Sequence, residues 1–220
     1  MNAPLRSRFD IRHVSDPAAR HEVFRFRYRV YVEMMGRRQK HADHVAGTVE
    51  EPLDRTATIF AAYLDGAVVG TIRGNRMDDP AAQYYRRLYA FDRHFDYDPA
   101  HATLSTKLMV LPALQRTALP VRLIAEYAEH RGYRLGSRID FLDCNKPLIG
   151  FFQRWGYVLY RGWAFHREYG TVMPMCCPTD QISRLERLRS PLAMFASSYY
   201  ADNAFGGTDL AMRLASTTDA

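Results

Sequence analysis

The segment from Leu104 to Ile124 constrains the fold most, because it combines a β-strand pattern, a proline-marked turn and the start of an α-helix. Apolar and polar residues alternate up to Val110, and Pro112 cannot donate to a β-ladder, so the strand should end near it. Apolar residues then recur at helical spacing, at Leu119, Leu123, Ile124 and Tyr127. The segment is either an ordinary strand-to-helix turn of an α/β core or an anion site at a helix N-terminus.

Two clear elements precede this segment. A short strand near Phe9 to Val14 leads to a helix that Asp16 caps and Pro17 opens, and that ends near Met35. Residues 56–64 and 67–75 flank Asp65-Gly66, a dipeptide typical of two-residue β-hairpin turns. Between them, residues 36–55 are polar and lack periodicity, which predicts a long and therefore functional loop.

The remaining elements alternate between helix and strand. We expect a helix over residues 79–95, a strand over 138–144, a short helix over 145–155, and a strand pair over 157–167 and 171–177. This order predicts one α/β domain over residues 1–177, with a mixed sheet and helices on both faces. Residues 178–220 should form a C-terminal helical extension and tail, packed on the domain or partly flexible.

The charge balance favours acidic partners. The formal net charge is +6, and only three of the 30 basic residues are lysines, so the surface is rich in arginine. Nucleic acid is not expected, since no nucleic-acid-binding motif is present. Three cysteines are too few for a disulfide framework or a zinc site, and no metal site is expected. With no signal peptide or membrane span in the sequence, a cytoplasmic protein is the expectation.

Arg27 stands out in the first helix. At 100° per residue it lies near the middle of the broad apolar face, whereas Arg25 and Arg29 point away. A buried arginine needs acceptors or it costs several kcal/mol. Arg27 therefore belongs either to an internal ion pair or to a substrate site, and the two roles are compatible.

Five stretches, taken in order, resemble the N-acetyltransferase (GNAT) superfamily over roughly residues 5–177. Three of them are more specifically similar to the N-acyl amino acid synthases and the related acyl-homoserine-lactone (autoinducer) synthases: FRFRYRVYVEMMG, EPLD followed by AAYLDGAVVGTIR, and STKLMVLPALQRT. The other two are NKPLIGFFQRWGY, a superfamily feature, and HREYGTVMPM, which resembles the ending of the N-acyl amino acid synthases. The resemblance implies a three-layer α/β/α fold whose mixed, mostly antiparallel sheet is split near the middle.

The resemblance also implies a reaction. A primary amine attacks an acyl thioester directly, and a backbone N–H of the central strand holds the oxyanion, which places Leu108, Met109 and Val110 beside the donor. A base or an ordered water must take the proton of the amine. No tightly bound cofactor is implied.

The phosphate loop departs from the pattern of coenzyme A-dependent relatives. That pattern reads Gln/Arg-x-x-Gly-x-Gly/Ala, and the matching residues here are Gln115, Arg116, Thr117, Ala118, Leu119 and Pro120. Ala118 replaces a glycine and Pro120 lacks an N–H group, which weakens a pyrophosphate cradle. We therefore expect the donor to be an acyl-phosphopantetheine on acyl carrier protein, with acyl-coenzyme A as the less favoured alternative. Four arginines are candidate carrier contacts, or alternatively an ordinary solvated helix face: Arg116, Arg122, Arg131 and Arg134.

Two further departures concern the acid and the amine. The superfamily often places a tyrosine general acid where this chain has Phe152, so Tyr157 or a water is a possible substitute. Asn145 matches the asparagine that opens this motif. The lactone synthases carry Glu-x-Ser-Arg where this chain has Leu104 to Lys107, which counts against S-adenosylmethionine as the amine donor.

The resemblance gathers the expected site residues. Arg27, Glu51, Asp54 and Arg73 should form one charged cluster that serves the chemistry, with Glu51 as base directly or through water; the alternative is a purely structural ion network. Substrate contacts are expected from Tyr31, Lys107, Phe152 and Trp155, and the acyl pocket could also include Phe24, Leu108 and Phe151. Apolar residues of the extension are candidates to cover the acyl chain or touch a membrane: Leu185, Leu188, Leu192, Met194, Phe195, Tyr199 and Tyr200.

The sequence thus predicts an N-acyltransferase that moves a fatty acyl group from acyl carrier protein to the amino group of an amino acid or similar small amine. An autoinducer synthase is the close alternative. A non-catalytic module on the same fold, binding lipid or nucleic acid, is the alternative from another class.

Overall fold

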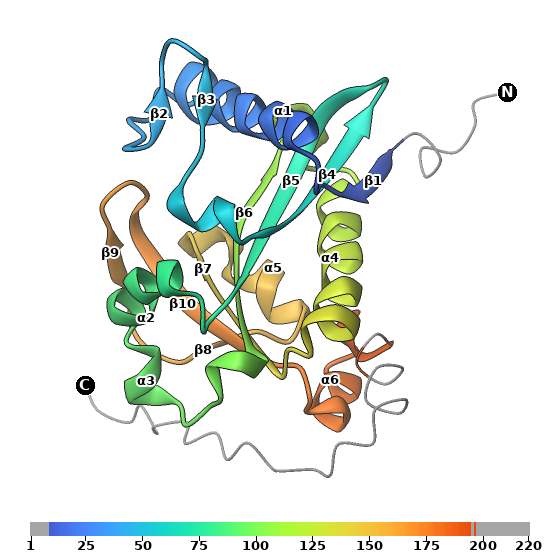
Figure 1. Cartoon of the computed structure of the whole chain (residues 1–220). Coiled ribbons are helices and arrows are strands. Elements are labelled where there is room, and N and C mark those ends of the chain that lie inside the picture. The colour runs from blue at the N-terminus through green and yellow to red at the C-terminus, as the bar shows by residue number, and fades with distance from the viewer. Residues whose placement is uncertain (1–8, 195, 197–220) are drawn as a thin grey trace, which may run out of the picture. The chain divides into compact units, whose positions relative to one another are not determined.

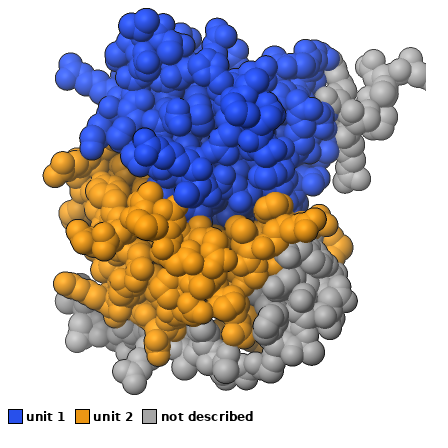
Figure 2. All heavy atoms as spheres, in the orientation of Figure 1, with its two compact units in different colours: residues 1–75, 105–128 blue, residues 76–104, 129–220 orange. Residues whose placement is uncertain are grey.

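The computed structural model describes residues 9–194 and 196. The chain divides into two compact units (Figure 2). Unit 1 comprises residues 1–75 and 105–128, and unit 2 comprises residues 76–104 and 129–220. Each unit has its own strands, helices and buried core.

Unit 1 is built on antiparallel strands. β1 (Asp10–His13) pairs with β4 (Thr58–Leu64), and β4 pairs with β5 (Ala67–Arg76) across the predicted Asp65-Gly66 turn (Figure 1). Both turn residues have positive φ, 51° at Asp65 and 79° at Gly66, as a two-residue hairpin turn of this kind requires. β6 (Ala102–Val110) follows β5 in the strand order, and its residues from Ser105 onward belong to unit 1.

The first helix begins as predicted and ends differently. The carboxylate of Asp16 accepts a hydrogen bond from the N–H of Ala19, and α1 (Pro17–Tyr28) follows. From Arg29 to Met34 the helix widens into a π-helical turn, η2, before Gly36 stops it at a φ of 62°. Such π segments occur frequently at functional sites.

The predicted loop over residues 36–55 is wrong in part. It contains a small hairpin, β2 (Ala42–Asp43) with β3 (Thr48–Val49), and a 3-10 turn, η3 (Pro52–Arg55). The carboxylate of Asp43 accepts from two backbone N–H groups of the turn, which stabilises so short a pair. α1 packs along β3 (Figure 1).

The strand-to-helix segment has the predicted form. Beyond β6, η6 (Pro112–Leu114) leads to α4 (Leu119–Leu135). Within unit 1, the hydroxyl of Tyr127 lies so close to Gly74 that a Cβ there would be 1.7 Å from it. Glycine at this position is therefore needed for close packing between α4 and β5.

Unit 2 carries the remaining strands. Ala102–Leu104 of β6 pair in parallel with β7 (Ile139–Cys144), and β7 pairs with β10 (Gly170–Pro178) in antiparallel fashion. β10 also pairs with β8 (Val158–Leu159) and β9 (Ala164–His166), which replace the single strand predicted over 157–167. The parallel ladder stops at Leu104, so the sheet is mixed, mostly antiparallel and interrupted along β6, and the predicted fold class is confirmed.

The helices of unit 2 correct one prediction. The helix expected over residues 79–95 is a 3-10 turn, η4 (Pro80–Ala82), followed by α2 (Gln83–Tyr89) and α3 (Phe91–His94). Ala90 separates the two at a φ of 53°, a left-handed conformation that ends α2. The break places Tyr89 and Phe91, each fully buried, among the aromatic rings around Phe141.

The other elements of unit 2 follow the prediction. Another 3-10 turn, η5 (Pro99–His101), precedes β6, and η7 (Lys146–Leu148) precedes α5 (Ile149–Arg154). The extension begins with α6 (Ile182–Arg187). Leu185 and Leu192 are buried and so cannot touch a membrane, whereas Leu188 and Met194 are exposed. Their role over an acyl chain stays a prediction. Phe195, Tyr199 and Tyr200 lie outside the described residues, and the domain boundary at 177 stays a prediction.

The described helices include none that combines the length and apolar character needed to cross a bilayer.

Candidate active site

α1 buries Arg27 in unit 1. The residue lies on the apolar face of the helix, as the periodicity predicts, and its side chain is 0% exposed. Its Nη1 atom lies 2.7 Å from Oδ1 of Asp54. The internal ion pair that the sequence left open is therefore present.

Glu51 and Asp54 are held by the 3-10 turn η3. The N–H of Glu51 donates to Oδ2 of Asp54 at 2.7 Å, and the N–H of Asp54 donates to the carbonyl of Glu51 at 2.8 Å. Pro52 fixes the backbone between them at a position where a helical turn tolerates the loss of an N–H group. Both carboxylates are thus set in place by local backbone structure.

Arg73 of β5 connects the two carboxylates. Its Nη1 lies 2.8 Å from Oε2 of Glu51 and 3.2 Å from Oδ1 of Asp54. Its Nε donates to the hydroxyl of Thr106 on β6 at 2.9 Å. Arg73 is fully buried, and it connects β5 to two elements that are distant in the sequence, η3 and β6.

Lys107 enters the same group because β6 is irregular. The residue has a φ of 54°, a left-handed conformation within a strand, and such a position marks a bulge that re-aims a side chain. Its Nζ lies 2.5 Å from Oε1 of Glu51 and 4.9 Å from the ring centroid of Tyr31. The alternation along β6 predicts a regular strand and gives no sign of this turn.

The five charged side chains form what we call the buried charge cluster: Arg27, Glu51, Asp54, Arg73 and Lys107. They are the buried charged residues described in unit 1, and they comprise three cations and two carboxylates. The structure brings together all four residues of the predicted charged group, together with Lys107 and Tyr31. Thr106 is a partner that the sequence did not single out, because as a strand residue next to Lys107 it carried no separate signal.

Burial and pairing shift the protonation equilibria in opposite directions. Burial lowers the pKa of Lys107 to about 8, although Glu51 acts against this shift. Burial also works to raise the pKa of the Glu51 carboxyl, but Arg73 and Lys107 outweigh it and hold that pKa well below its usual range. The pKa of Asp54 is lowered in the same way by Arg27 and Arg73 against burial. Tyr31 stays neutral, since burial and the Glu51 charge raise its pKa to about 12.

These pKa shifts bear on the prediction that Glu51 is the base. A carboxylate held by two cations has little affinity for a proton, so Glu51 is better suited to orient groups than to accept a proton directly. Its assignment as a base through water stays a prediction.

The phosphate loop, also in unit 1, already uses several of its N–H groups. The N–H groups of Gln115 and Thr117 donate to carbonyls of the preceding turn, and the N–H of Leu119 donates to the hydroxyl of Thr117 at 3.2 Å. Pro120 has no N–H to offer. Arg116 and Ala118 are exposed. Fewer N–H groups of this loop are therefore available to an anion, and the identity of the acyl donor stays a prediction.

The strand residues expected beside the donor lie just after the bulge. Met109 and Val110 are buried in unit 1, whereas Leu108 is half-buried. Their role toward a thioester stays a prediction.

Unit 2 holds the other predicted site residues. Asn145 is exposed at the start of η7, while Phe152 and Trp155 are buried, with the Phe152 ring 5.7 Å from that of Tyr157. The Tyr157 hydroxyl donates to Oδ2 of Asp140 at 2.5 Å, and its pKa is raised well above the usual value by burial and by Asp140. A hydroxyl held in this way is a poor proton donor to a leaving thiolate, which disfavours Tyr157 as the substitute acid.

One proposed carrier contact is wrong. Arg131 is buried, and its Nη1 lies 2.7 Å from Oδ2 of Asp140, so it stabilises the interior of unit 2 and cannot meet an external protein. Arg122 is half-buried and donates to the carbonyl of Phe9 at 3.4 Å. Arg116 and Arg134 are exposed and remain candidates.

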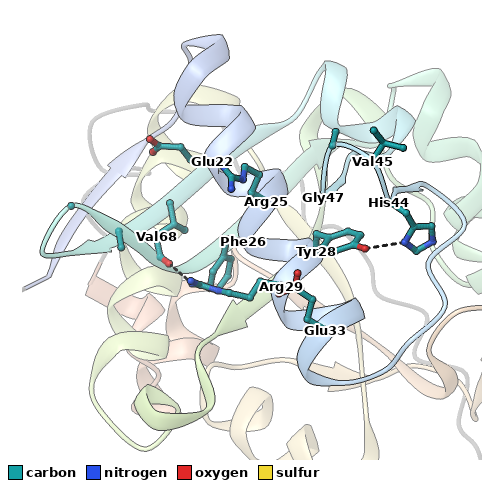
Figure 3. A pocket seen from close by; sticks show the side chains of 13 residues that line it. Glu22, Arg25, Phe26, Tyr28, Arg29, Glu33, His44, Val45, Gly47 and Val68 are labelled. Atoms are coloured by element: carbon teal, nitrogen blue, oxygen red, sulfur yellow. Dashed lines mark hydrogen bonds between the residues drawn. The ribbon is translucent and has the colours of Figure 1, made fainter.

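Unit 1 also has a surface groove of about 520 Å³ on the outer side of α1 (Figure 3). Charged side chains of both signs line it, with the Tyr28 hydroxyl 2.9 Å from Nδ1 of His44 at one end and Arg29 donating to the carbonyl of Val68 at the other. A fatty acyl chain needs an apolar wall, so this groove does not suit it.

Comparison with known proteins agrees with the fold. The chain belongs to the acetyltransferase (GNAT) family, which matches residues 22–157. No curated protein sequence matches the chain.

Solved structures with the same fold include the predicted relatives. FeeM, an N-acyl amino acid synthase from uncultured soil microbes, has a TM-score of 0.58 at 16% identity and covers 86% of this chain and 98% of its own. MesI, a coenzyme A-dependent acyl-homoserine lactone synthase, has a TM-score of 0.63 at 17% identity, with coverage of 92% and 99%. TofI, solved with an inhibitor and MTA, has a TM-score of 0.61 at 18% identity, with coverage of 85% and 99%. The resemblance found in the sequence is confirmed at the level of family and fold.

Proposed function

We propose that the protein is an N-acyltransferase that moves a fatty acyl group from a phosphopantetheine thioester to the amino group of an amino acid or a similar small amine that carries a carboxylate. The observation that carries this proposal is the composition of the buried charge cluster, three cations to two carboxylates. Membership of the GNAT family supports acyl transfer as the reaction class.

The surplus positive charge of the cluster is the reason for proposing an acceptor that carries a carboxylate. A buried charge without a counter-ion is costly, and a carboxylate brought by the substrate would offset it. Lys107 is the cation that shows the surplus, because burial lowers its pKa to about 8 despite its contact with Glu51. A bound carboxylate would stabilise the charged form of Lys107. An amine without a carboxylate would gain nothing from the cluster.

The same charge favours the reactive form of the amine. The ammonium group of the acceptor must lose a proton before it attacks, and cations nearby lower its pKa. The amine nitrogen then bonds to the thioester carbonyl carbon, the C–S bond breaks, and the pantetheine sulfur leaves as thiolate or thiol. The proton of the amine passes to solvent, directly or by a water near Glu51. No covalent enzyme intermediate is needed.

The donor is proposed to be acyl carrier protein. The loop from Gln115 to Pro120 retains few donors for a pyrophosphate, and the arginine-rich chain suits an acidic carrier. MesI is coenzyme A-dependent, which keeps acyl-coenzyme A as the alternative donor.

The second candidate is an acyl-homoserine-lactone synthase, favoured by the fold shared with MesI. By the resemblance, Leu104 occupies the position at which the lactone synthases carry the glutamate of their Glu-x-Ser-Arg motif. Leu104 is fully buried in unit 2. An apolar core residue cannot contact the charged sulfonium substrate of a lactone synthase, so we rank this function lower.

The experiment is a transfer assay with the purified protein. Acyl carrier protein and coenzyme A, each loaded with acyl chains of several lengths, are offered with the amino acids, with simple alkylamines and with S-adenosylmethionine, and products are identified by mass spectrometry. N-acyl amino acids without N-acyl alkylamines are the expected result. Lactones would establish the second candidate, and the absence of any acylated product with every donor would contradict both.

A further inference from the structure

The hairpin of β9 and β10 in unit 2 lies beside α2 (Figure 1), and its side chains divide into a buried and an exposed set. On β9, Ala164 and His166 are buried, and the His166 ring stacks between those of Tyr85 and Tyr169. The intervening residue Phe165 is 61% exposed, and Trp163, two positions earlier, is 66% exposed. Because strand residues alternate between faces, these two aromatic side chains share the open face.

An arginine flanks the two aromatic residues on each side, one in the bend before β9 and one in the turn after it. Positions 161, 163, 165 and 167 read Arg, Trp, Phe, Arg, and we call these four residues the aromatic hairpin face. Arg167 is exposed in the turn, whereas Arg161 is half-buried, with its Nη1 3.3 Å from the carbonyl of Leu88. Glu168 is the acidic residue of this turn, so the segment from 161 to 170 keeps a surplus of one positive charge.

From this arrangement we infer that the aromatic hairpin face binds an anionic lipid surface, with Trp163 and Phe165 entering the headgroup region and the flanking arginines contacting lipid phosphates. The aromatic hairpin face belongs to unit 2 and the buried charge cluster to unit 1, and the inference does not depend on the proposed reaction.

The size of the patch favours a lipid surface over a protein. Two aromatic side chains exposed by about two-thirds present roughly 200–300 Å² between them, whereas a stable protein interface buries about 800 Å² on each partner. A bilayer needs no complementary surface, and tryptophan and arginine are both favoured at its interface. The arginines and the chain's net charge of +6 specify an anionic rather than a neutral surface.

The two tryptophans of the chain make the test specific. Trp163 is 66% exposed and Trp155 is 2% exposed, so a shift of emission to shorter wavelength on binding reports on Trp163. The full chain is mixed with vesicles of phosphatidylcholine alone or with about one-third phosphatidylglycerol, and binding is measured by emission and by co-sedimentation. We expect binding to the anionic vesicles, weakened by salt, and loss of the emission shift but not of binding in Trp163→Phe.

The decisive variant is the double substitution Trp163→Ser with Phe165→Ser. It should reduce binding to anionic vesicles by about 10-fold or more, because two interfacial aromatic side chains are removed. The control is Val45→Ser, an apolar residue that is 101% exposed in unit 1, and it should bind like the parent protein. Both sets of positions are exposed, so folding is preserved, and the buried Trp155 emission verifies it.

Three results would overturn the inference. The first is a parent protein that does not bind anionic vesicles, and the second is a double variant that binds them as well as the parent does. The third is a Trp163 shift that needs acyl carrier protein or a higher protein concentration instead of lipid, since the face would then meet a carrier or a second copy of the chain.

Discussion

Nζ of Lys107 lies 2.5 Å from Oε1 of Glu51, while Nη1 of Arg73 lies 2.8 Å from the other oxygen of the same carboxylate. One carboxylate thus serves two buried cations, and Asp54 likewise serves Arg27 and Arg73. The cluster is held together but not neutralised. This imbalance underlies the first three predictions.

Lys107→Met should separate stability from function. The substitution removes the surplus cation and leaves two arginines with two carboxylates, so we expect unchanged or higher stability against urea. Acceptor binding should weaken by about 10-fold or more, because the charge that attracts the substrate carboxylate is lost. Urea denaturation and the KM for the amino acid measure the two effects.

The matched control is Lys146→Met, since Lys146 is exposed in unit 2. It should change neither quantity. If Lys107→Met lost stability and kept its KM, Lys107 would be a structural ion-pair partner and the proposed acceptor site would be wrong.

The pH dependence of stability should carry the signature of Lys107. Its pKa is lowered from 10.5 to about 8 in the folded protein, so between these values the unfolded chain binds more protons. The stability of the parent protein relative to Lys107→Met should therefore rise as pH increases from about 8 to about 10.5. Below about pH 8 both the folded and the unfolded chain hold the proton, so the relative stability no longer changes with pH. Urea denaturation of both proteins at about pH 7 and about pH 10 tests the sign. A stability of the parent protein that falls relative to Lys107→Met as pH rises would contradict the burial of this cation.

Asp54→Asn should destabilise the protein far more than so small a change of side chain suggests. Arg27 and Arg73 would lose a charged partner in the interior, and breaking a buried ion pair costs about 3–5 kcal/mol. The free energy of unfolding in urea measures the loss. Asp10→Asn is the control, because Asp10 and Arg12 form an exposed pair, and it should leave stability unchanged.

The sequence predicted the elements of this site better than their geometry. Helical periodicity alone indicated that Arg27 is buried, and Asp65-Gly66 fixed the hairpin that carries Arg73. Glu51 and Asp54 lay in a segment without periodicity, so only the family resemblance pointed to them. Their exact placement depends on the η3 turn, in which each residue satisfies the backbone of the other.

The sequence could not reveal two backbone conformations, because the residue types at those positions disfavour them. Lys107 and Ala90 both adopt positive φ, although neither is a residue type with a preference for it. At Lys107 the ion pair with Glu51 favours the turn, and at Ala90 the burial of Tyr89 and Phe91 does. Such tertiary effects have no signature in the alternation of residues along a strand or helix.

Gly74→Ala tests the close packing of α4 against β5, the strand that carries Arg73. A Cβ at Gly74 would lie 1.7 Å from the hydroxyl oxygen and 2.2 Å from the Cζ of Tyr127, so the ring would have to move. Overpacking of this kind costs about 1–3 kcal/mol, and the shift would also disturb the adjacent Arg73. We expect lower stability in urea together with a reduced rate of acyl transfer.

The control for this prediction is Gly150→Ala. A Cβ at Gly150, an exposed position of helix α5, meets no atom within 4 Å, so this substitution should raise stability by up to about 1 kcal/mol through helix propensity. Adding Tyr127→Phe to Gly74→Ala removes the hydroxyl that clashes, although ring carbons remain close, and should recover part of the lost stability. Equal stability of Gly74→Ala and Gly150→Ala would show that β5 and α4 are not in close contact at this point.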